Sequence, residues 1–134
     1  MEKRTHGYGP HLMLDLNDCN PEILNDLEAC FKLLSELPPQ IKMTKITQPY
    51  VFRYNADDPE ESGITGIVII AESHISLHTY PKKKFVFVDL FSCKPFDTEK
   101  AKNYVVNFFQ SRSVKSFVRE RGEDFPVSPK VRTE

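Results

Sequence analysis

Apolar and polar residues alternate along three segments in the middle of the chain. Alternate residues of an extended segment lie on the same face of a sheet, so this pattern predicts strands with one buried face. Their many β-branched residues favour strands over helices. Three further segments show weaker forms of the pattern, and Pro49 predicts a break in one of them. The expected strands are 11–16, 41–54, 64–71, 74–80, 84–93 and 113–120.

Two other segments have apolar residues at helical spacing. The first covers residues 21–37, follows the capping residue Asn20 and is expected to end at Pro38 and Pro39. The second is expected to begin after Asp97, and its apolar stripe consists of Ala101, Val105, Phe108 and Phe109. The order of elements is strand, helix, four strands, helix and strand. It predicts an α+β two-layer sandwich in which two helices cover one face of a mainly antiparallel sheet.

Composition and charge are those of an ordinary globular protein with one domain, residues 1–134. Of the 134 residues, 40% are hydrophobic and 28% are charged, and the net charge is −1. This balance gives no reason to expect nucleic acid or an anionic membrane as a partner. No apolar run reaches the roughly 18 residues of a membrane span, and the first ten residues lack the apolar segment of a secretory signal. A cytoplasmic location is therefore expected.

The cysteines and the one dense basic cluster add little chemistry by themselves. Cys19, Cys30 and Cys93 are an odd number of cysteines without CxxC spacing, so neither a disulfide framework nor a zinc ribbon is expected. The run from Lys82 to Lys84 is typical of a solvated turn between strands.

The two central strands separate aliphatic residues from reactive ones. On the predicted strand 74–80, Ile75 and Leu77 point to one face, and the opposite face consists of His74, Ser76, His78 and Tyr80. On the predicted strand 84–93, the corresponding face consists of Phe85, Phe87, Asp89, Phe91 and Cys93. The aliphatic faces suit a helix layer, whereas the other face is either a half-exposed surface or a functional site.

Three chemical interpretations of these residues compete with simple packing. His74 and His78 have the HxxxH spacing of a zinc site, but on a strand they would be about 13 Å apart and could not bind one ion together. Cys93 and His78 could form a nucleophile and its base, although the sequence shows no glycine elbow or oxyanion donors. Ser73 as a hydrolase nucleophile lacks the G-x-S-x-G turn. No metal is expected.

One combination of residues is more specific than any of these pairs. The stretch ESHISLHTYP, followed by VDLFSC, has a histidine five residues after the serine of its ESH triplet and a cysteine twenty residues after it. This combination resembles the pyruvoyl-dependent S-adenosylmethionine decarboxylase proenzymes of the short prokaryotic type. The resemblance extends from the GPHLMLDL strand to the last helix. It implies a carboxy-lyase that decarboxylates S-adenosylmethionine, a small-molecule substrate, for spermidine biosynthesis.

The resemblance also implies that the chain makes its own cofactor. Autocatalytic cleavage between Glu72 and Ser73 would produce a β chain, residues 1–72, and an α chain, residues 73–134. Ser73 would become a covalent pyruvoyl group, which would be the only cofactor and would form a Schiff base with the substrate amine. The resemblance further implies an (αβ)₂ heterotetramer of cleaved chains.

Two proton transfers are assigned by the resemblance. His78 would be the proton acceptor in processing, and the hydroxyl of Thr65 would assist it. Cys93 would be the proton donor in catalysis. A straight strand would place Ser73 and His78 about 16 Å apart on opposite faces, so a bend or hairpin is expected around residues 71–74.

Substrate recognition requires aromatic side chains that stack on adenine and contact the sulfonium. The candidates are Phe52, Tyr54 and Tyr80. Lys82 departs from the family's pattern, because a glutamate that binds the ribose hydroxyls usually stands there and a lysine accepts no hydrogen bond. Other acids that could supply the contact are Glu60, Glu61 and Asp89.

Two alternative functions remain open. The departure at Lys82 also allows a pyruvoyl-dependent ornithine or arginine decarboxylase on the same scaffold. A non-catalytic relative would not cut itself, and the presence of Ser73, His78 and Cys93 disfavours that alternative. His74 is given no catalytic role and is expected to be a packing or turn histidine.

Overall fold

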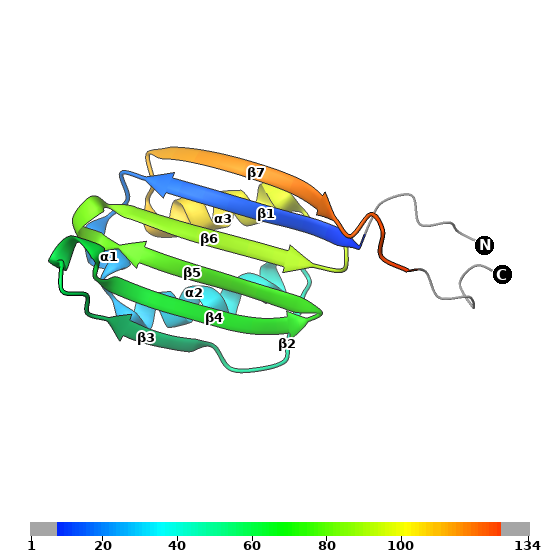
Figure 1. Cartoon of the computed structure of the whole chain (residues 1–134), viewed down its shortest axis with the longest axis horizontal. Helices are drawn as coiled ribbons and strands as arrows, with labels where there is room; N and C mark the ends of the chain where they lie inside the picture. The colour runs from blue at the N-terminus through cyan, green and yellow to red at the C-terminus, as the bar shows by residue number, and fades with distance from the viewer. Residues whose placement is uncertain (1–7, 127–134) are drawn as a thin grey trace, which may run out of the picture.

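Residues 8–126 fold around one seven-stranded antiparallel sheet (Figure 1). The computed structural model describes residues 8–126. Hydrogen-bonded neighbours follow the order β2-β4-β5-β6-β1-β7, and β3 also pairs with β4. The strands are β1 (Gly9–Asn17), β2 (Thr44–Lys45), β3 (Tyr50–Tyr54), β4 (Gly63–Ala71), β5 (Ser73–Tyr80), β6 (Phe85–Ser92) and β7 (Ser113–Arg121).

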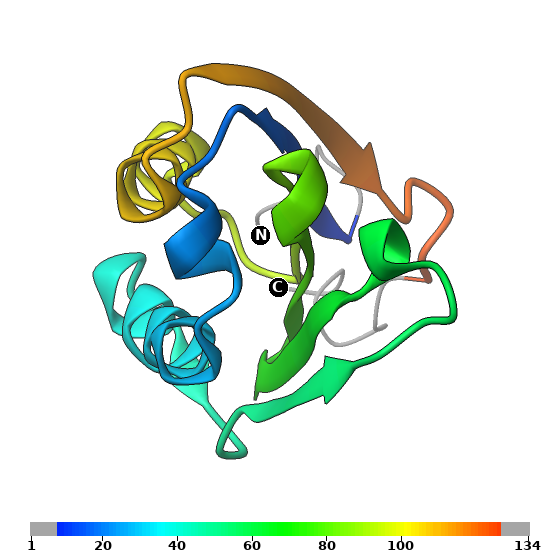
Figure 2. The ribbon, with the colours of Figure 1, turned by 90° about the vertical axis from the view of Figure 1, so that its left-hand side faces the viewer.

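The helices lie on one face of this sheet, as the view in Figure 2 shows. They are α1 (Pro21–Leu24), α2 (Leu27–Gln40) and α3 (Thr98–Phe109). The predicted α+β two-layer sandwich is therefore confirmed. No helix in the described part of the chain is long and apolar enough to cross a membrane.

The expectation of one continuous helix over residues 21–37 is wrong. Asp26 begins a new helix, because its side chain accepts hydrogen bonds from the backbone N–H groups of Glu28 and Ala29 at 3.0 and 3.2 Å. Pro38 and Pro39 do not end α2 but lie in its last turn. Their carbonyls accept the closing hydrogen bonds of the helix, although neither proline has an N–H group to donate.

The other predicted elements lie close to their expected positions. The extended segment 41–54 is divided into β2 and β3, with Pro49 immediately before β3. The Asp97 side chain accepts a hydrogen bond from the Lys100 N–H at 3.0 Å and caps α3 as predicted. Within the predicted stripe of α3, Phe108 is only partly buried, whereas the other three residues are fully buried. Part of the predicted tail, 127–134, lies outside the described residues.

The core lies between the helices and the aliphatic face of the sheet. Leu77 of β5 and Val88 of β6 are fully buried there, as the alternation predicts. Helix α2 packs closely on β4, because a Cβ atom on Gly66 would lie 2.8 Å from Leu34 Cδ1. Thr79 is buried on this face, where its hydroxyl donates to the Leu24 carbonyl at 2.8 Å. This packing fixes which face of each strand stays open.

The opposite face of the sheet is not covered by any described helix (Figure 2). It carries the polar and aromatic residues that alternate with the core residues on β5 and β6. Several large apolar side chains remain exposed, including Tyr50 at 62%, Phe52 at 55%, Phe87 at 41% and Phe117 at 50%. Such an extended aromatic surface is unusual for an isolated monomer and is typical of a surface that binds something.

Candidate active site

A tight hairpin at Glu72 joins β4 to β5 and holds Ser73 at the start of β5. Ile70 pairs with Ser73 across the turn, which leaves Ala71 and Glu72 as the connection. The backbone φ angle of Ser73 is +143°, in a region that residues with a side chain rarely adopt. The hairpin expected around residues 71–74 is therefore present. A residue held in such a conformation stores about 1–3 kcal/mol of strain.

Cys93 lies beside this hairpin because β6 pairs with β5. Ser92 is the register partner of Ser73, so the next residue, Cys93, reaches the turn. Its backbone N–H donates to the Glu72 carbonyl at 3.2 Å, and its thiol donates to Glu72 Oε1 at 3.3 Å. The structure thus brings together three predicted residues, Glu72, Ser73 and Cys93.

The other two cysteines are unsuited to chemistry. Burial raises the pKa of Cys19 to about 11 and the pKa of Cys30 to about 12. Both thiols are inside the core, whereas Cys93 is partly accessible. A reactive thiol must be reached by its substrate, so Cys93 is the cysteine that fits the predicted role.

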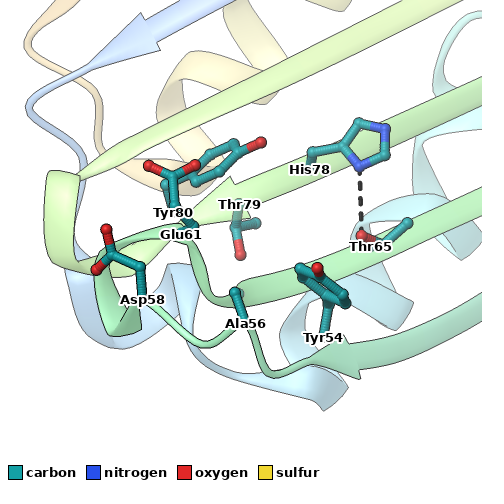
Figure 3. Close-up of a pocket in the computed structure, with 9 residues that line it drawn as sticks. Tyr54, Ala56, Asp58, Glu61, Thr65, His78, Thr79 and Tyr80 are labelled. Carbon is teal, nitrogen blue, oxygen red and sulfur yellow. Dashed lines mark hydrogen bonds between the residues drawn. The ribbon is translucent and has the colours of Figure 1, made fainter.

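His78 and Thr65 form a second group of predicted residues. They are register partners on β5 and β4, and the Thr65 hydroxyl lies 3.3 Å from His78 Nδ1 (Figure 3). This group is far from Ser73 within the same chain, because β5 is continuous from Ser73 to Tyr80 and five residues of strand span about 16 Å. The hairpin precedes Ser73 and does not shorten that distance.

A cavity of about 570 Å³ lies next to His78 and Thr65. Tyr54 and Tyr80, two of the three aromatic candidates from the sequence, line it (Figure 3). Phe52 is not among its lining residues and instead lies exposed on β3. The combination of aromatic rings with a few polar groups is typical of a small-molecule site.

Two carboxylates from the 55–62 loop also line this cavity. Of the acids suggested by the sequence, Glu61 lines it, whereas Glu60 does not. Asp89 is elsewhere on the sheet and accepts a hydrogen bond from His11 at 3.3 Å. The second lining acid is Asp58, which the sequence did not single out because one more acid in a polar loop gives no distinctive signal.

The acidic loop is held in place by specific contacts. Lys83 Nζ lies 2.6 Å from Glu61 Oε2, and this hydrogen bond raises the pKa of Lys83. Asp58 caps the 3₁₀ turn Pro59–Glu61 by accepting from the Glu60 N–H at 2.9 Å. Lys82 is exposed and does not line the cavity. Position 82 therefore contributes no side chain to the cavity. Glu61 supplies a carboxylate there, and Lys83 holds it in place.

His74 belongs to neither group. Its pKa is lowered, mainly by partial burial and also by the nearby His11, whereas Asp89 opposes the effect. Its ring packs edge-on against Phe91 with the centroids 6.0 Å apart. Among residues 8–126, no group of three or more histidine, cysteine or acidic side chains is placed to hold a metal ion. The packing role expected for His74 agrees with these contacts.

The sequence missed Tyr8, which precedes β1 and carries no motif. Partial burial raises the pKa of its hydroxyl, and interactions with Cys93 and Glu72 raise it further. Its ring centroid lies 5.7 Å from that of Phe91. Tyr8 therefore joins the group around the Glu72–Ser73 bond from a distant part of the sequence.

Comparisons with known proteins give one family. The S-adenosylmethionine decarboxylase family profile matches residues 10–122. A relative from Thermodesulfovibrio yellowstonii, named S-adenosylmethionine decarboxylase proenzyme, is 34% identical over 118 residues, which are 87% of this chain and 83% of the relative. A relative of the same name from Pyrococcus abyssi is 28% identical over 123 residues and covers 87% of this chain and 84% of its own.

A solved structure agrees with the sequence comparisons. The crystal structure of the adenosylmethionine decarboxylase from Aquifex aeolicus superposes with a TM-score of 0.75 at 26% identity, and the match covers 93% of this chain and 97% of that one. The sequence comparisons and the structural comparison therefore point to the same family over most of the chain. The chain belongs to the S-adenosylmethionine decarboxylase family.

Proposed function

We propose that this chain is a proenzyme that cuts itself between Glu72 and Ser73 and then decarboxylates S-adenosylmethionine in the cytoplasm, supplying the aminopropyl donor for spermidine synthesis. The observation that carries the proposal is the accessible thiol of Cys93, held 3.3 Å from the Glu72 side chain at the strained hairpin. The relatives described above carry the name S-adenosylmethionine decarboxylase proenzyme. The rings of Tyr54 and Tyr80 in the cavity favour an adenosyl group over the side chain of ornithine or arginine.

The cleavage chemistry uses atoms at the hairpin. The Ser73 hydroxyl attacks the Glu72 carbonyl carbon, so the amide becomes an ester and the nitrogen stays on residue 73. Removal of the Ser73 α-proton breaks the bond between the Ser73 side-chain oxygen and its Cβ, and Glu72 leaves as a carboxylate. The resulting dehydroalanine tautomerises and reacts with water, which releases ammonia and leaves a pyruvoyl group. Strain at the φ angle of Ser73 favours the first step, which is otherwise uphill.

The two products would stay together because the sheet is shared between them. Strands β1 to β4 belong to residues 1–72, and β5 to β7 belong to residues 73–134. Strand β1 lies between β6 and β7, and β4 pairs with β5, so backbone hydrogen bonds join the two fragments along three strand pairs. The cut therefore leaves the fold and the position of Cys93 intact.

The residues around position 73 fit a pyruvoyl group there. Its ketone would bind the substrate amine and withdraw electrons from the α-carbon as carbon dioxide leaves. Cys93 is placed at the same turn and is proposed to donate the proton that the α-carbon then requires.

A second copy of the chain is proposed to complete the site. His78 and Thr65 are about 16 Å along a straight strand from Ser73 of their own chain, too far for proton transfer. The open face of the sheet exposes enough aromatic surface to pack against another sheet. Two copies packed through this face, with strands running in opposite directions, would bring His78 of each copy toward Ser73 of the other. After cleavage, such a pair would be the expected (αβ)₂ assembly.

The cavity beside His78 is proposed to bind the adenosyl group. Tyr54 and Tyr80 would contact the adenine and the sulfonium. Glu61 would accept hydrogen bonds from the ribose hydroxyls, the same chemistry by which carboxylates bind ribose in dinucleotide sites. Its carboxylate is already fixed by Lys83.

Replacing Glu61 should therefore weaken substrate binding. In Glu61→Gln, KM for S-adenosylmethionine should rise about tenfold, the cost of one weakened charged hydrogen bond, while kcat and self-cleavage change little. The matched control is Glu60→Gln, because Glu60 is on the same turn but does not line the cavity. Equal KM values in the two variants would show that Glu61 does not contact the substrate.

Replacing Cys93 should separate processing from catalysis. Cys93→Ala should still cut at Glu72–Ser73, but its carbon dioxide release should fall by about 10²–10⁴-fold, since the α-carbon loses its acid. Intact mass tests the cutting, and carbon dioxide release from S-adenosylmethionine, ornithine and arginine, measured in parallel, tests the turnover and the choice of substrate. The wild-type chain should act on S-adenosylmethionine alone. Full activity of Cys93→Ala, or release from ornithine or arginine instead, would contradict the assignment.

A further inference from the structure

Tyr8 is fixed beside the cleavage site by contacts that do not involve the Glu72–Ser73 bond. Its backbone N–H donates to the Arg121 carbonyl at the end of β7. Its ring packs against Phe91, and edge-on against Phe125 with the centroids 4.7 Å apart. Gly122, with φ of +75°, permits the close approach, because a Cβ atom there would lie 2.5 Å from the Tyr8 Cβ. Tyr8 is therefore held in a well-packed cluster of residues where β1 begins and β7 ends.

The Tyr8 hydroxyl interacts with both the Cys93 thiol and the Glu72 carboxyl. These interactions, together with partial burial, raise the pKa of Tyr8, so its hydroxyl stays protonated and acts as a hydrogen-bond donor. The Cys93 thiol itself donates to Glu72 Oε1. Before cleavage, two donors therefore share the Glu72 side chain.

Cleavage would affect the residues of this cluster differently. Tyr8 and Glu72 belong to residues 1–72, whereas Cys93 belongs to residues 73–134. Once the bond to Ser73 is broken, Glu72 becomes a chain end and loses its covalent link to the rest of the turn. Tyr8 keeps its place, because β1 pairs with both β6 and β7 and its ring contacts are unchanged.

We propose that Tyr8 is a positioning residue for Cys93 in the cleaved enzyme. Its hydroxyl remains beside the thiol after the Glu72 end is released and keeps the thiol directed at residue 73. The inference rests on the proposed function, since it assigns the thiol the role of proton donor. It adds a residue of the β chain to a step that the α chain performs.

Tyr8→Phe tests this role, because it removes the hydroxyl and keeps the ring contacts. Self-cleavage should proceed, while kcat for carbon dioxide release should fall about tenfold with little change in KM. The matched control is Tyr104→Phe, which removes a similar bond between a tyrosine and a carboxylate, Tyr104 to Glu36, on the helix layer. Equal kcat values for the two variants would overturn the proposal.

A second readout does not depend on the activity of the cleaved enzyme. In the uncut Ser73→Ala chain, iodoacetamide should alkylate Cys93 selectively, since Cys19 and Cys30 are buried. Adding Tyr8→Phe should slow this alkylation several-fold, because the thiol loses the contact that directs it toward the accessible side of the turn. An unchanged rate would show that the hydroxyl does not act on the thiol, and a faster rate would show that it shields the thiol; either result would overturn the proposal. If the wild-type chain neither cuts nor decarboxylates, the proposed function fails, and this comparison still tests the contact.

Discussion

Ser73→Ala chains should remain uncut and should release no carbon dioxide from S-adenosylmethionine above background. Alanine has no hydroxyl to attack the Glu72 carbonyl, so neither the ester nor the pyruvoyl group can form. The variant therefore loses both self-cleavage and decarboxylation, and this is the largest effect expected from any single substitution in the chain. Intact mass would show one species with the mass of the full chain.

The control for this substitution is Ser76→Ala, three residues further along β5. Ser76 is on the open face of the same strand but not at the hairpin, so its variant should cut like the wild-type chain. A Ser73→Ala sample that still separates into two fragments would mean that another residue performs the attack. A Ser76→Ala sample that fails to cut would mean that the open face, rather than the Ser73 hydroxyl, limits the reaction.

His78→Ala should slow self-cleavage by about 10²–10⁴-fold, the usual cost of losing a general base. The more informative result concerns mixtures. If His78 acts on Ser73 of a second copy, co-expression of His78→Ala with Ser73→Ala should restore cutting, because each mixed pair contains one intact serine facing one intact histidine. With random pairing at equal amounts, about half of the His78→Ala chains should be cut.

Two chain masses distinguish the variants in such a mixture, since each substitution changes the mass differently. Fragments should derive from the His78→Ala chain alone, because the other chain has no serine at the scissile bond. If the mixture stays as uncut as each variant alone, His78 acts within its own chain or not at all, and the proposed packing of two sheets is wrong.

Periodicity predicted the faces of the sheet because burial on one side imposes it. The alternation on β5 and β6 placed Leu77 and Val88 in the core and His78 on the open face. The same pattern could not show that Asp26 begins a second helix, since a capping aspartate inside an amphipathic run leaves the apolar spacing unchanged. Nor could it show that Pro38 lies within the last turn of α2.

The residues of the site were predictable where a motif names them, and their grouping was not. The spacing from Ser73 to Cys93 identifies a pair that strand pairing then brings to one turn. Tyr8 belongs to the group around Ser73, and Asp58 belongs to the group around His78, both through tertiary contacts. No local sequence pattern marks either residue. The separation of His78 from Ser73 follows from a straight β5, which the sequence allowed but did not require.

Intact-mass analysis of the purified wild-type chain tests the central claim most directly. Two fragments should be found, one corresponding to residues 1–72 and the other to residues 73–134 with a blocked amino terminus that reacts with borohydride. A single uncut chain that shows no reaction with borohydride would contradict the account.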